Sequence, residues 1–475
     1  MNLTKEQQSV VDYVKASKDE ELILVDSVAG SGKTTLLRGI AQAISGQEGM
    51  YLAYNKAIAT ESKKKFPSNI DCRTTHSLAY KYAVIPMGLK VGFFGPKQVT
   101  NKMKYSNKVM LVEDIKEFCL SSYLTYEEYA KANGRVNQEL ANHYLNQMAI
   151  GTIDCSHDFY LKMFHMALAE GSINMEELEL LMLDEAGDLN EVTLEIFKLL
   201  PARVKIAVGD PNQNIYGFNY TINCFEKLQG QGTTFKLSKS FRVPQSIAGP
   251  MQDFCRTYLN PDMNFEGTDV ENGTIRTRGY ISRTNGGLIN KLVELNNDNV
   301  SYGLVRKASE IFKLPLMVAG LKYQGKIYDN AYKHIQDDVD DWHEDRSISR
   351  ENPKVLGYLR KLYAEDLALV QAINLVTAHG AGGIFSAYNE AKRHENTKQD
   401  LMLLTAHSSK GLEFDEVMLA PDMNTSIASI IEAIDNKLEN ESIEDILDPI
   451  ARESLNLYYV ACTRALVQLR NAEYL

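Results

Sequence analysis

Residues 27–35, Ser-Val-Ala-Gly-Ser-Gly-Lys-Thr-Thr, decide how the rest of the chain is interpreted. They follow the apolar run 22–25 and precede an apolar segment with helical spacing, so a buried strand, a glycine-rich turn and a helix are predicted. Successive backbone N–H groups of such a turn hold phosphate oxygens at the helix N-terminus. Lys33 would reach the terminal phosphates, and the Thr34 hydroxyl would ligate Mg²⁺. Ser27 stands where the strict pattern has glycine, but the strand-turn-helix order still predicts a nucleotide-binding loop.

The composition is that of an ordinary globular protein. The chain has 475 residues, of which 44% are hydrophobic and 24% charged, so it is too long for one core and several lobes are predicted. The formal net charge of −11 argues against a protein that coats nucleic acid over its whole surface. A local basic groove stays open, because steering depends on where charge lies rather than on its sum.

Neither a membrane span nor a disulfide or metal framework is predicted. No apolar run approaches about 18 residues, and the N-terminus lacks the basic-then-apolar plan of a signal peptide. Six scattered cysteines without a C-x-x-C pair fit buried thiols in a reducing compartment, so we expect a cytoplasmic protein. The cluster Cys155-Ser156-His157-Asp158 lacks a second ligand pair at metal spacing.

A second nucleotide signal lies at residues 180–185. An apolar run ends there in Asp184-Glu185, which would place one carboxylate on a Mg²⁺ ion and the other beside the attacking water. Such a pair is common after buried strands. Its position downstream of a phosphate-binding loop favours the functional interpretation.

Repeated buried strands and helices predict a parallel α/β fold, with chemistry at the carboxyl ends of the strands. The strand pattern restarts at Phe235, resumes at 401–405 and is expected to close with residues 456–465. Residues 77–175 and 322–399 have mostly helical spacing instead. We therefore predict two α/β lobes, each interrupted by a helical insertion.

The series of motifs resembles one family, the UvrD/Rep-like superfamily 1 helicases, and within it the F-box DNA helicase branch. Nine motifs stand in the order of that family: 3–7 for the Q motif, 29–34 for motif I, 54–56 for Ia, 75–77 for Ib, 184–188 for II, 209–218 for III, 240–242 for IV, 405–415 for V and 459–465 for VI. The resemblance spans nearly the whole chain. It implies two RecA-like motor domains, 1–76 with 176–231 and 232–321 with 400–475, which carry helical insertions at 77–175 and 322–399.

The resemblance also implies which residues hold and hydrolyse ATP with Mg²⁺. The catalytic residues correspond to Lys33, Glu185, Gln213, Arg242 and Arg464, the two arginines acting as fingers from the second lobe. The metal ligands correspond to Thr34 and Asp184. The nucleotide-binding residues correspond to Gln7, Ala29, Gly30, Ser31, Gly32, Lys33, Thr34, Thr35, Phe241 and Glu413, with Phe241 on adenine beside Gln7. A site that both lobes complete would close and open with the nucleotide, which supplies a motor stroke.

Contacts to single-stranded DNA are implied for Tyr54, Asn55, His76, Phe218 and His407. Planar rings offer each base a sequence-tolerant platform worth about 1–3 kcal/mol. Core packing is the alternative for Tyr54 and Phe218, and a satisfied core histidine is the alternative for His407.

Three departures from the family pattern bear on function. Gly187 replaces the usual Gln of motif II, which removes an amide that links the γ-phosphate to DNA. Asn219-Tyr220 replaces the usual Arg-Gly after Phe218, and segment 322–399 is short beside the second insertion of the bacterial members. These departures leave open how strongly nucleotide turnover is coupled to unwinding.

The main functional prediction is an ATP-dependent single-stranded DNA translocase and helicase with 3′→5′ polarity, which acts as a monomer on single strands or junctions. One alternative is a remodeller that strips proteins from DNA with little unwinding, which Gly187 and the short second insertion favour. Another is a nucleotide-gated DNA-binding subunit of a larger assembly. Protein partners in replication, repair or recombination and a bacterial or phage source are further expectations, whereas a membrane is not a predicted partner.

Overall fold

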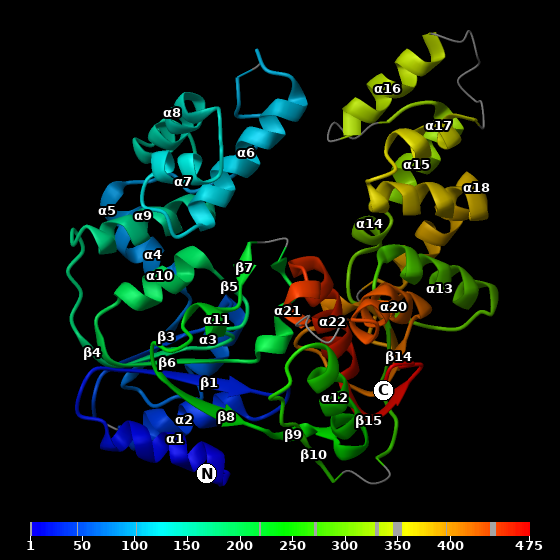
Figure 1. Cartoon of the computed structure of the whole chain (residues 1–475). Helices are drawn as coiled ribbons and strands as arrows, with labels where there is room; N and C mark the ends of the chain where they lie inside the picture. The colour runs from blue at the N-terminus through cyan, green and yellow to red at the C-terminus, as the bar shows by residue number, and fades with distance from the viewer. Residues whose placement is uncertain are drawn as a thin grey trace. The chain divides into compact units, whose positions relative to one another are not determined.

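The computed structural model of the chain describes residues 2–44, 46–100, 102–217, 220–269, 273–327, 332–344, 354–395, 397–437 and 443–475 (Figure 1). It divides into two compact units. Met1–Arg242 and Asn264–Glu266 form the first, and Val243–Met263 and Gly267–Leu475 form the second. The chain passes from one unit to the other within strand β9 (Lys239–Pro244), which pairs with β10 (Glu266–Thr268) in a two-stranded sheet.

The first unit is built on a six-stranded parallel sheet in the order β3-β2-β4-β6-β1-β8. Its strands are β1 (Glu21–Ser27), β2 (Gly49–Leu52), β3 (Ile70–Arg73), β4 (Leu178–Leu183), β6 (Ala202–Gly209) and β8 (Thr233–Leu237). Side chains alternate between the two faces along β1. Ile23 and Val25 share a buried cluster with α1 (Lys5–Ala16) and α2 (Lys33–Ala43), and Leu24 lies in a different cluster. The apolar run is therefore buried on both faces, as a strand inside a parallel sheet is.

Short elements complete this α/β part and lead the chain between the strands. They are α3 (Lys56–Ser62), α4 (Thr75–Ala79), α10 (Glu191–Leu199), the 3-10 turn η2 (Pro211–Gln213), α11 (Cys224–Lys227) and the antiparallel pair β5 (Leu189–Asn190) and β7 (Thr221–Ile222).

Strand β8 belongs to the first unit, which corrects the predicted domain boundary at residue 232. The sequence pattern assigns the strand at Phe235 to the second lobe, whereas in the structure Val25 lies beside Phe235 in a parallel ladder. A strand pattern does not tell which sheet the strand joins, because parallel neighbours are brought together by crossover connections of many residues.

The segment between β3 and β4 is mainly helical. It holds the π-helix η1 (Tyr80–Val84), α5 (Ile85–Met87), α6 (Tyr105–Leu120), α7 (Tyr126–Ala132), α8 (Gln138–Ala149) and α9 (His157–Ala169) (Figure 1). Phe118 of α6 and Phe164 of α9 lie in a buried cluster that continues to Leu181 and Leu183 of β4. This shared core fixes α6 and α9 against the sheet.

The second unit contains a five-stranded parallel sheet in the order β12-β13-β11-β14-β15. Its strands are β11 (Arg278–Ser282), β12 (Gly303–Leu304), β13 (Leu401–Thr405), β14 (Phe414–Leu419) and β15 (Ala465–Arg470). Its helices are α12 (Gln245–Tyr258), α13 (Asn285–Asn297), α14 (Ala308–Ile311), α15 (Lys313–Gln324), α16 (Lys333–Glu344), α17 (Lys354–Leu362), α18 (Leu367–Arg393), α19 (Ala406–Ser409), α20 (Pro421–Asp435), α21 (Ile443–Ile446) and α22 (Pro449–Cys462). The predicted fold class, two parallel α/β lobes with helical insertions, is confirmed.

The end of the second sheet differs from the prediction. Most of segment 456–465 belongs to helix α22, and the closing strand is β15. The part of the helix from Ser454 to Cys462 is buried all round, and Leu457, Tyr458 and Tyr459 are each fully buried. A short, wholly apolar run does not distinguish a buried helix from a buried strand by its periodicity.

Helix α18 is, among the described residues, long and apolar enough by length and composition to cross a membrane. No such span is predicted from the sequence. The backbone of Gly380, with φ 71° and ψ 161°, interrupts the helix. Each half is about 20 Å long at ~1.5 Å per residue, which is short of the ~30 Å hydrocarbon core of a bilayer. Leu369, Ile373 and Val376 lie in the buried core of the second unit. The packing favours a core helix.

Candidate nucleotide and nucleic-acid site

The glycine-rich turn between β1 and α2 has the backbone that phosphate-binding loops require. Gly30 (φ 75°) and Gly32 (φ 79°) are left-handed, a conformation that residues with a Cβ rarely adopt. A Cβ on Gly30 would also lie 2.6 Å from the Cβ of Arg242. The Ser27 hydroxyl donates to the Gly209 carbonyl oxygen at 2.6 Å, which ties the loop to β6. The serine thus makes a structural contact where the strict motif has glycine.

Lys33 begins helix α2 and forms an ion pair with Glu185, its Nζ lying 3.0 Å from Oε2. Asp184 is buried beside this pair, and its Oδ2 accepts a hydrogen bond of 2.6 Å from the Tyr51 hydroxyl. Oδ1 of Asp184 accepts from the backbone N–H of Glu185 at 2.9 Å, and Glu185 has a left-handed backbone with φ 55°. The end of β4 therefore presents two carboxylates: Asp184 is hydrogen-bonded to Tyr51, and Glu185 is paired with Lys33.

The charges of this cluster shift one another's pKa values. Burial raises the pKa of the Asp184 carboxyl, and Glu185 adds to that shift while Lys33 opposes it. Burial lowers the pKa of Lys33, but Glu185, Asp184 and Asp210 outweigh it, and the net shift is upward. The lysine is held charged among more carboxylates than it can neutralise, a surplus that a divalent cation would offset.

The residues of the loop fit a phosphate chain with a divalent cation. The buried Ser31 hydroxyl has no hydrogen-bond partner within the described part of the chain. Thr34 is exposed in the first turn of α2, and Thr35 beside it is half-buried. Thr34 and Asp184 supply oxygen ligands of the kind that Mg²⁺ prefers.

Gln7 lies against the loop, held by the capping box that the sequence predicts. Its backbone N–H donates to the Thr4 hydroxyl, and its Oε1 accepts from the Thr4 N–H, both at 3.1 Å. Its Nε2 donates to the Ser31 carbonyl oxygen at 3.1 Å. Phe241 is 55% exposed, and its ring carbons lie 3.6 Å from where a Cβ on Gly32 would stand. Gln7 and Phe241 thus flank the same glycine, as an adenine site between them requires.

The Ser-Phe-Arg segment of motif IV lies in the first unit, which corrects the prediction that Arg242 comes from the second lobe. The Ser240 hydroxyl donates to the Ala29 carbonyl oxygen at 2.8 Å, and the Phe241 N–H donates to the Gly30 carbonyl oxygen at 2.9 Å. The strand that leaves the first unit is therefore bonded directly to the loop.

Gln213 lies in the turn η2, where its Nε2 donates to Oδ2 of Asp210 at 2.7 Å. The same turn approaches the end of β4 so closely that a Cβ on Gly187 would lie 2.6 Å from the Asp210 carbonyl oxygen. A side chain at 187, including the glutamine usual in motif II, does not fit unless the backbone moves.

Gly187→Ala is expected to lower the free energy of unfolding by about 1–3 kcal/mol, because the new methyl group overlaps a backbone oxygen. Urea unfolding followed by circular dichroism measures the loss. Gly357→Ala in α17 is the control, since a Cβ there meets no atom within 4 Å and alanine favours a helix. Unchanged stability of the Gly187 variant would contradict the close contact.

Asp26, in β1, makes stability depend on pH. Burial and then the nearby Asp210 raise its pKa to about 6, and Lys236 opposes them in part. The folded state favours the neutral acid, so this contribution to stability is fully present below the unfolded pKa of about 4 and is lost as the pH rises through about 6. Asp26→Asn is expected to stabilise the fold by about 2–3 kcal/mol at a pH near 8 and to be neutral near pH 4. Urea unfolding at both pH values measures this, and an equal effect at both would refute the shift.

Rings and basic side chains line a groove of 510 Å³ at the ends of β2 and β3. Tyr54 lies two residues after the end of β2. It is 48% exposed, which argues against packing in the core. The other rings and the basic groups of the groove are His76, Tyr80, His157, Tyr160, Lys56, Lys63 and Arg73. Aromatic rings beside cationic groups are the usual lining of single-strand binding grooves.

The histidines of this groove belong to a ring cluster. The centroids of His76 and Tyr160 lie 5.9 Å apart in an edge-to-face arrangement, and Nδ1 of His157 lies 2.9 Å from the Tyr160 hydroxyl. Burial, and then His157, lower the pKa of His76 to about 4, so its ring is neutral at pH 7. Asn55 is exposed, and its Oδ1 accepts from the Ile58 N–H at 2.9 Å, so it caps α3.

The first unit does not bring the remaining predicted residues to the Lys33–Glu185 cluster or to the groove. Phe218 lies outside the described residues. His407, Glu413 and Arg464 belong to the second unit. Nε2 of His407 lies 3.4 Å from Oε1 of Glu453, Glu413 is exposed before β14, and the buried Arg464 donates from Nε to the Val460 carbonyl oxygen at 2.8 Å. Their assigned roles stay predictions.

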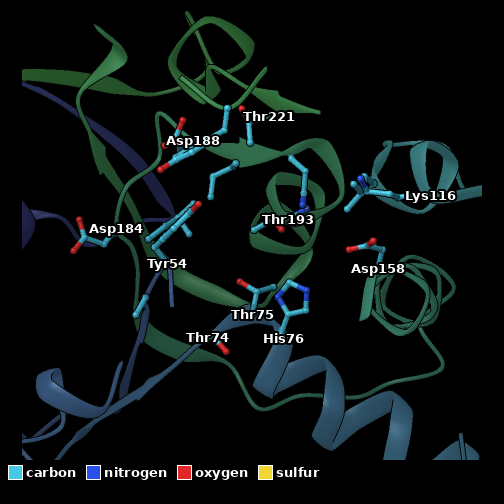
Figure 2. A pocket seen from close by; sticks show the side chains of 16 residues that line it. Tyr54, Thr74, Thr75, His76, Lys116, Asp158, Asp184, Asp188, Thr193 and Thr221 are labelled. Carbon is cyan, nitrogen blue, oxygen red and sulfur yellow. The ribbon is translucent and has the colours of Figure 1, made fainter. Parts of the chain in front are cut away.

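A second cavity, of 280 Å³, opens beside Asp184 and was not foreseen (Figure 2). Residues from the sheet and from the helical insertion line it, including Tyr54, His76, Lys116 and Asp158. Tyr51 was also missed, although its contact with Asp184 is a direct consequence of the pairing of β2 with β4. Sequence patterns do not reveal such contacts, because they depend on sheet order and helix docking.

Comparisons with known proteins agree with this site. A family model described as an AAA domain matches residues 11–219. The chain is 24% identical to F-box DNA helicase protein 1 of Schizosaccharomyces pombe, over 98% of this chain and 56% of that protein. It is 22% identical to F-box DNA helicase 1 of Gallus gallus, over 98% of this chain and 48% of that protein. The chain spans about half the length of these relatives. The motifs, the two parallel α/β lobes and these matches together support a superfamily 1 helicase related to the F-box DNA helicase branch.

Proposed function

We propose that the chain is an ATP-dependent motor that moves along single-stranded DNA with 3′→5′ polarity and separates duplexes. The observation that carries the proposal is the junction of two sites on one parallel sheet: the Lys33–Glu185 cluster and the ring-lined groove. Tyr51, which bonds Asp184, and Tyr54, which lines the groove, stand at the same strand end. Tyr51 and Tyr54 are three positions apart in the chain, so a structural change at the phosphate site would have a short path to the bound DNA strand. The relatives are named DNA helicases, which supports the choice of DNA.

The residues of the first unit divide the work of hydrolysis. Lys33 would hold the terminal phosphates, and Thr34 and Asp184 would hold Mg²⁺, which when bound neutralises charge on the transferring phosphoryl group. The ion pair of Lys33 with Glu185 keeps both groups in place without nucleotide. When nucleotide binds, the Lys33 ammonium would pair with its phosphates instead of with Glu185. The Glu185 carboxylate could then orient the attacking water and accept its proton. Gln213 would respond to the γ-phosphate. By the family pattern the arginine finger corresponds to Arg464, which belongs to the second unit.

Directional displacement tests this proposal. Single strands that carry streptavidin on a biotin at the 5′ or the 3′ end are incubated with the chain and ATP. A 3′→5′ motor is expected to release streptavidin from the 5′ end only. Release from the 3′ end would refute the polarity, and release from neither end would refute the motor.

One observation favours a second function, the stripping of proteins from DNA with little unwinding. The backbone contact at Gly187 excludes the amide that couples the γ-phosphate to DNA in the family pattern. Strand separation and displacement of a bound protein, measured on one tailed duplex, separate the two functions. Displacement without strand separation would establish the second.

Tyr54→Ala is expected to weaken binding of a single strand by about 5- to 150-fold, which corresponds to one lost base stack of about 1–3 kcal/mol. Basal ATP turnover should not change, since the ring lies in the groove. Fluorescence anisotropy with an oligothymidine measures the affinity. Tyr323→Ala, which removes a 69% exposed tyrosine of the second unit, is the matched control. Equal affinities of the two variants would show that Tyr54 does not carry a base.

A further inference from the structure

The pocket in Figure 2 holds a pair of unlike charges that the proposed motor does not use. Tyr54, Thr74 and His76 line both this pocket and the groove, so the two are neighbours. Lys116 of α6 and Asp158 of α9 face each other opposite Tyr54 (Figure 2). A cavity of 280 Å³ is near the lower end of the range of small-ligand pockets, roughly 300–1,000 Å³, and suits a group as small as one base.

The Asp158 carboxylate lacks a donor of its own. Within the described part of the chain no hydrogen bond or ion pair reaches it, although it is half-buried in the first turn of α9. The cap of that helix is Ser156, whose hydroxyl oxygen accepts from the Phe159 N–H at 3.2 Å. Burial raises the pKa of Asp158, and Lys116 opposes that shift, so the two charges sense each other without touching. This carboxylate can accept hydrogen bonds from a donor that enters the pocket.

Lys116 is held at the pocket by other neighbours. Its Nζ lies 3.3 Å from Oε1 of Glu113 and 5.5 Å from the centroid of the Tyr220 ring. The Tyr220 hydroxyl donates to the same Glu113 oxygen at 3.0 Å. Tyr220 has φ 58°, which is uncommon for a residue with a Cβ, and it replaces the glycine of the family pattern. This departure thus positions the lysine.

A carboxylate beside an ammonium matches one base better than the other three. A carboxylate only accepts hydrogen bonds, and an ammonium only donates them. Guanine presents two adjacent donors, N1–H and the N2 amine, next to the acceptor O6. Adenine, cytosine and thymine each present a single donor group on the corresponding edge. Tyr54 and His76 supply rings for the face of the base.

We propose that this pocket selects a guanine base from the bound strand. Asp158 accepts from N1–H and the N2 amine, Lys116 donates to O6, and Tyr220 positions the lysine. The inference rests on the proposed binding of single-stranded DNA. It makes the motor sensitive to base identity, whereas stacking in the groove tolerates every base.

Fluorescence anisotropy of the full chain tests the inference. The probes are labelled single strands of about 12 nucleotides, within the usual site size of ~4–16. They are oligothymidine and strands in which thymidine alternates with guanosine, inosine, adenosine or cytidine. The wild type is expected to bind the guanosine strand about 10-fold more tightly than the adenosine and cytidine strands. The inosine strand should bind far more weakly than the guanosine strand, because its base lacks the N2 amine and presents a single donor beside an acceptor, as thymine does.

Variants test which residues cause the preference for the guanosine strand. Asp158→Asn and Lys116→Met should each bring the guanosine preference below about 2-fold, with thermal unfolding unchanged, as the loss of a bidentate base contact predicts. Tyr220→Gly should weaken the preference through the lysine. Glu139→Gln, which neutralises an exposed carboxylate in the first turn of α8, should leave it intact.

The outcomes separate this inference from the proposed function. Tight and equal binding of all strands by the wild type would overturn the guanine pocket and leave single-strand binding standing. A preference that survives Asp158→Asn would overturn the assigned residues. A uniform loss of affinity in Lys116→Met would place that lysine on phosphate and overturn its contact with O6. Absence of binding to any strand would overturn the proposed function itself.

Discussion

Lys33→Ala is expected to lower the rate of ATP turnover by about 10²–10³-fold or more, as the removal of one preorganised charge contact does. The ammonium lies 3.0 Å from Glu185, and Asp184 and Asp210 also raise its pKa. Without it, the three carboxylates lose the ammonium group that offsets their charge when phosphates approach. The variant should therefore bind nucleotide weakly as well as turn over slowly.

Steady-state turnover and binding of a fluorescent ATP analogue measure both effects. Lys65→Ala is the matched control, because Lys65 is exposed and pairs with Glu61 only on the surface, where an ion pair is worth little. Loss of the ammonium group beside these carboxylates is also expected to lower the free energy of unfolding, so thermal unfolding is measured together with the kinetics. Turnover within tenfold of the wild type, in a folded variant, would show that Lys33 does not hold the transferring phosphate.

Glu185→Gln is expected to separate binding from chemistry. Turnover should fall by about 10²–10⁴-fold, the range for loss of a general base, while nucleotide affinity is kept or increased. The amide cannot accept a proton, but it removes a negative charge from the phosphate site and releases Lys33 from its ion pair. Asp184, held by Tyr51 and the backbone of residue 185, should keep its place.

Single-turnover hydrolysis with an excess of enzyme measures the chemical step directly. Glu195→Gln, which breaks a surface pair with Lys198, is the control. A Glu185 variant that hydrolyses bound nucleotide as fast as this control would assign the catalytic base to another group. The same experiment on Asp184→Asn would then identify which of the two carboxylates carries the reaction.

The part of the fold near residues 27–35 could be predicted because its cause is local. Glycines at the two left-handed positions, a preceding apolar run and a following helix are adjacent in the chain, and each element forms for reasons visible in its own sequence. The capping box at Thr4 and Gln7 is a local feature of the same kind.

Features that depend on sheet order could not be predicted from the sequence. β8 lies beside β1 after a separation of some 200 residues, and nothing in its own pattern indicates that neighbour. The contact of Ser240 with the Ala29 carbonyl follows from that placement, and so does the correction for Arg242. The sequence pattern assigns part of helix α22 to the sheet because residues 454–462 are buried on every side.

Features that depend on helix docking were missed for a similar reason. Lys116 and Asp158 lie on two helices of the insertion, and only the shared core of α6 and α9 with β4 brings them to one pocket. Tyr220 stood out in the sequence as a departure from the family pattern. Its partner Glu113 became visible only in the fold.

The central claim is that nucleotide turnover at Lys33 and Glu185 is coupled to a DNA strand in the neighbouring groove. The most direct measurement is the steady-state ATPase rate of the wild-type chain with and without oligothymidine, beside Tyr54→Ala and Lys33→Ala. We predict that the strand stimulates the wild type severalfold, that Tyr54→Ala needs more DNA for the same stimulation, and that Lys33→Ala stays inactive. A wild-type rate that is unaffected by saturating single-stranded DNA would contradict the account.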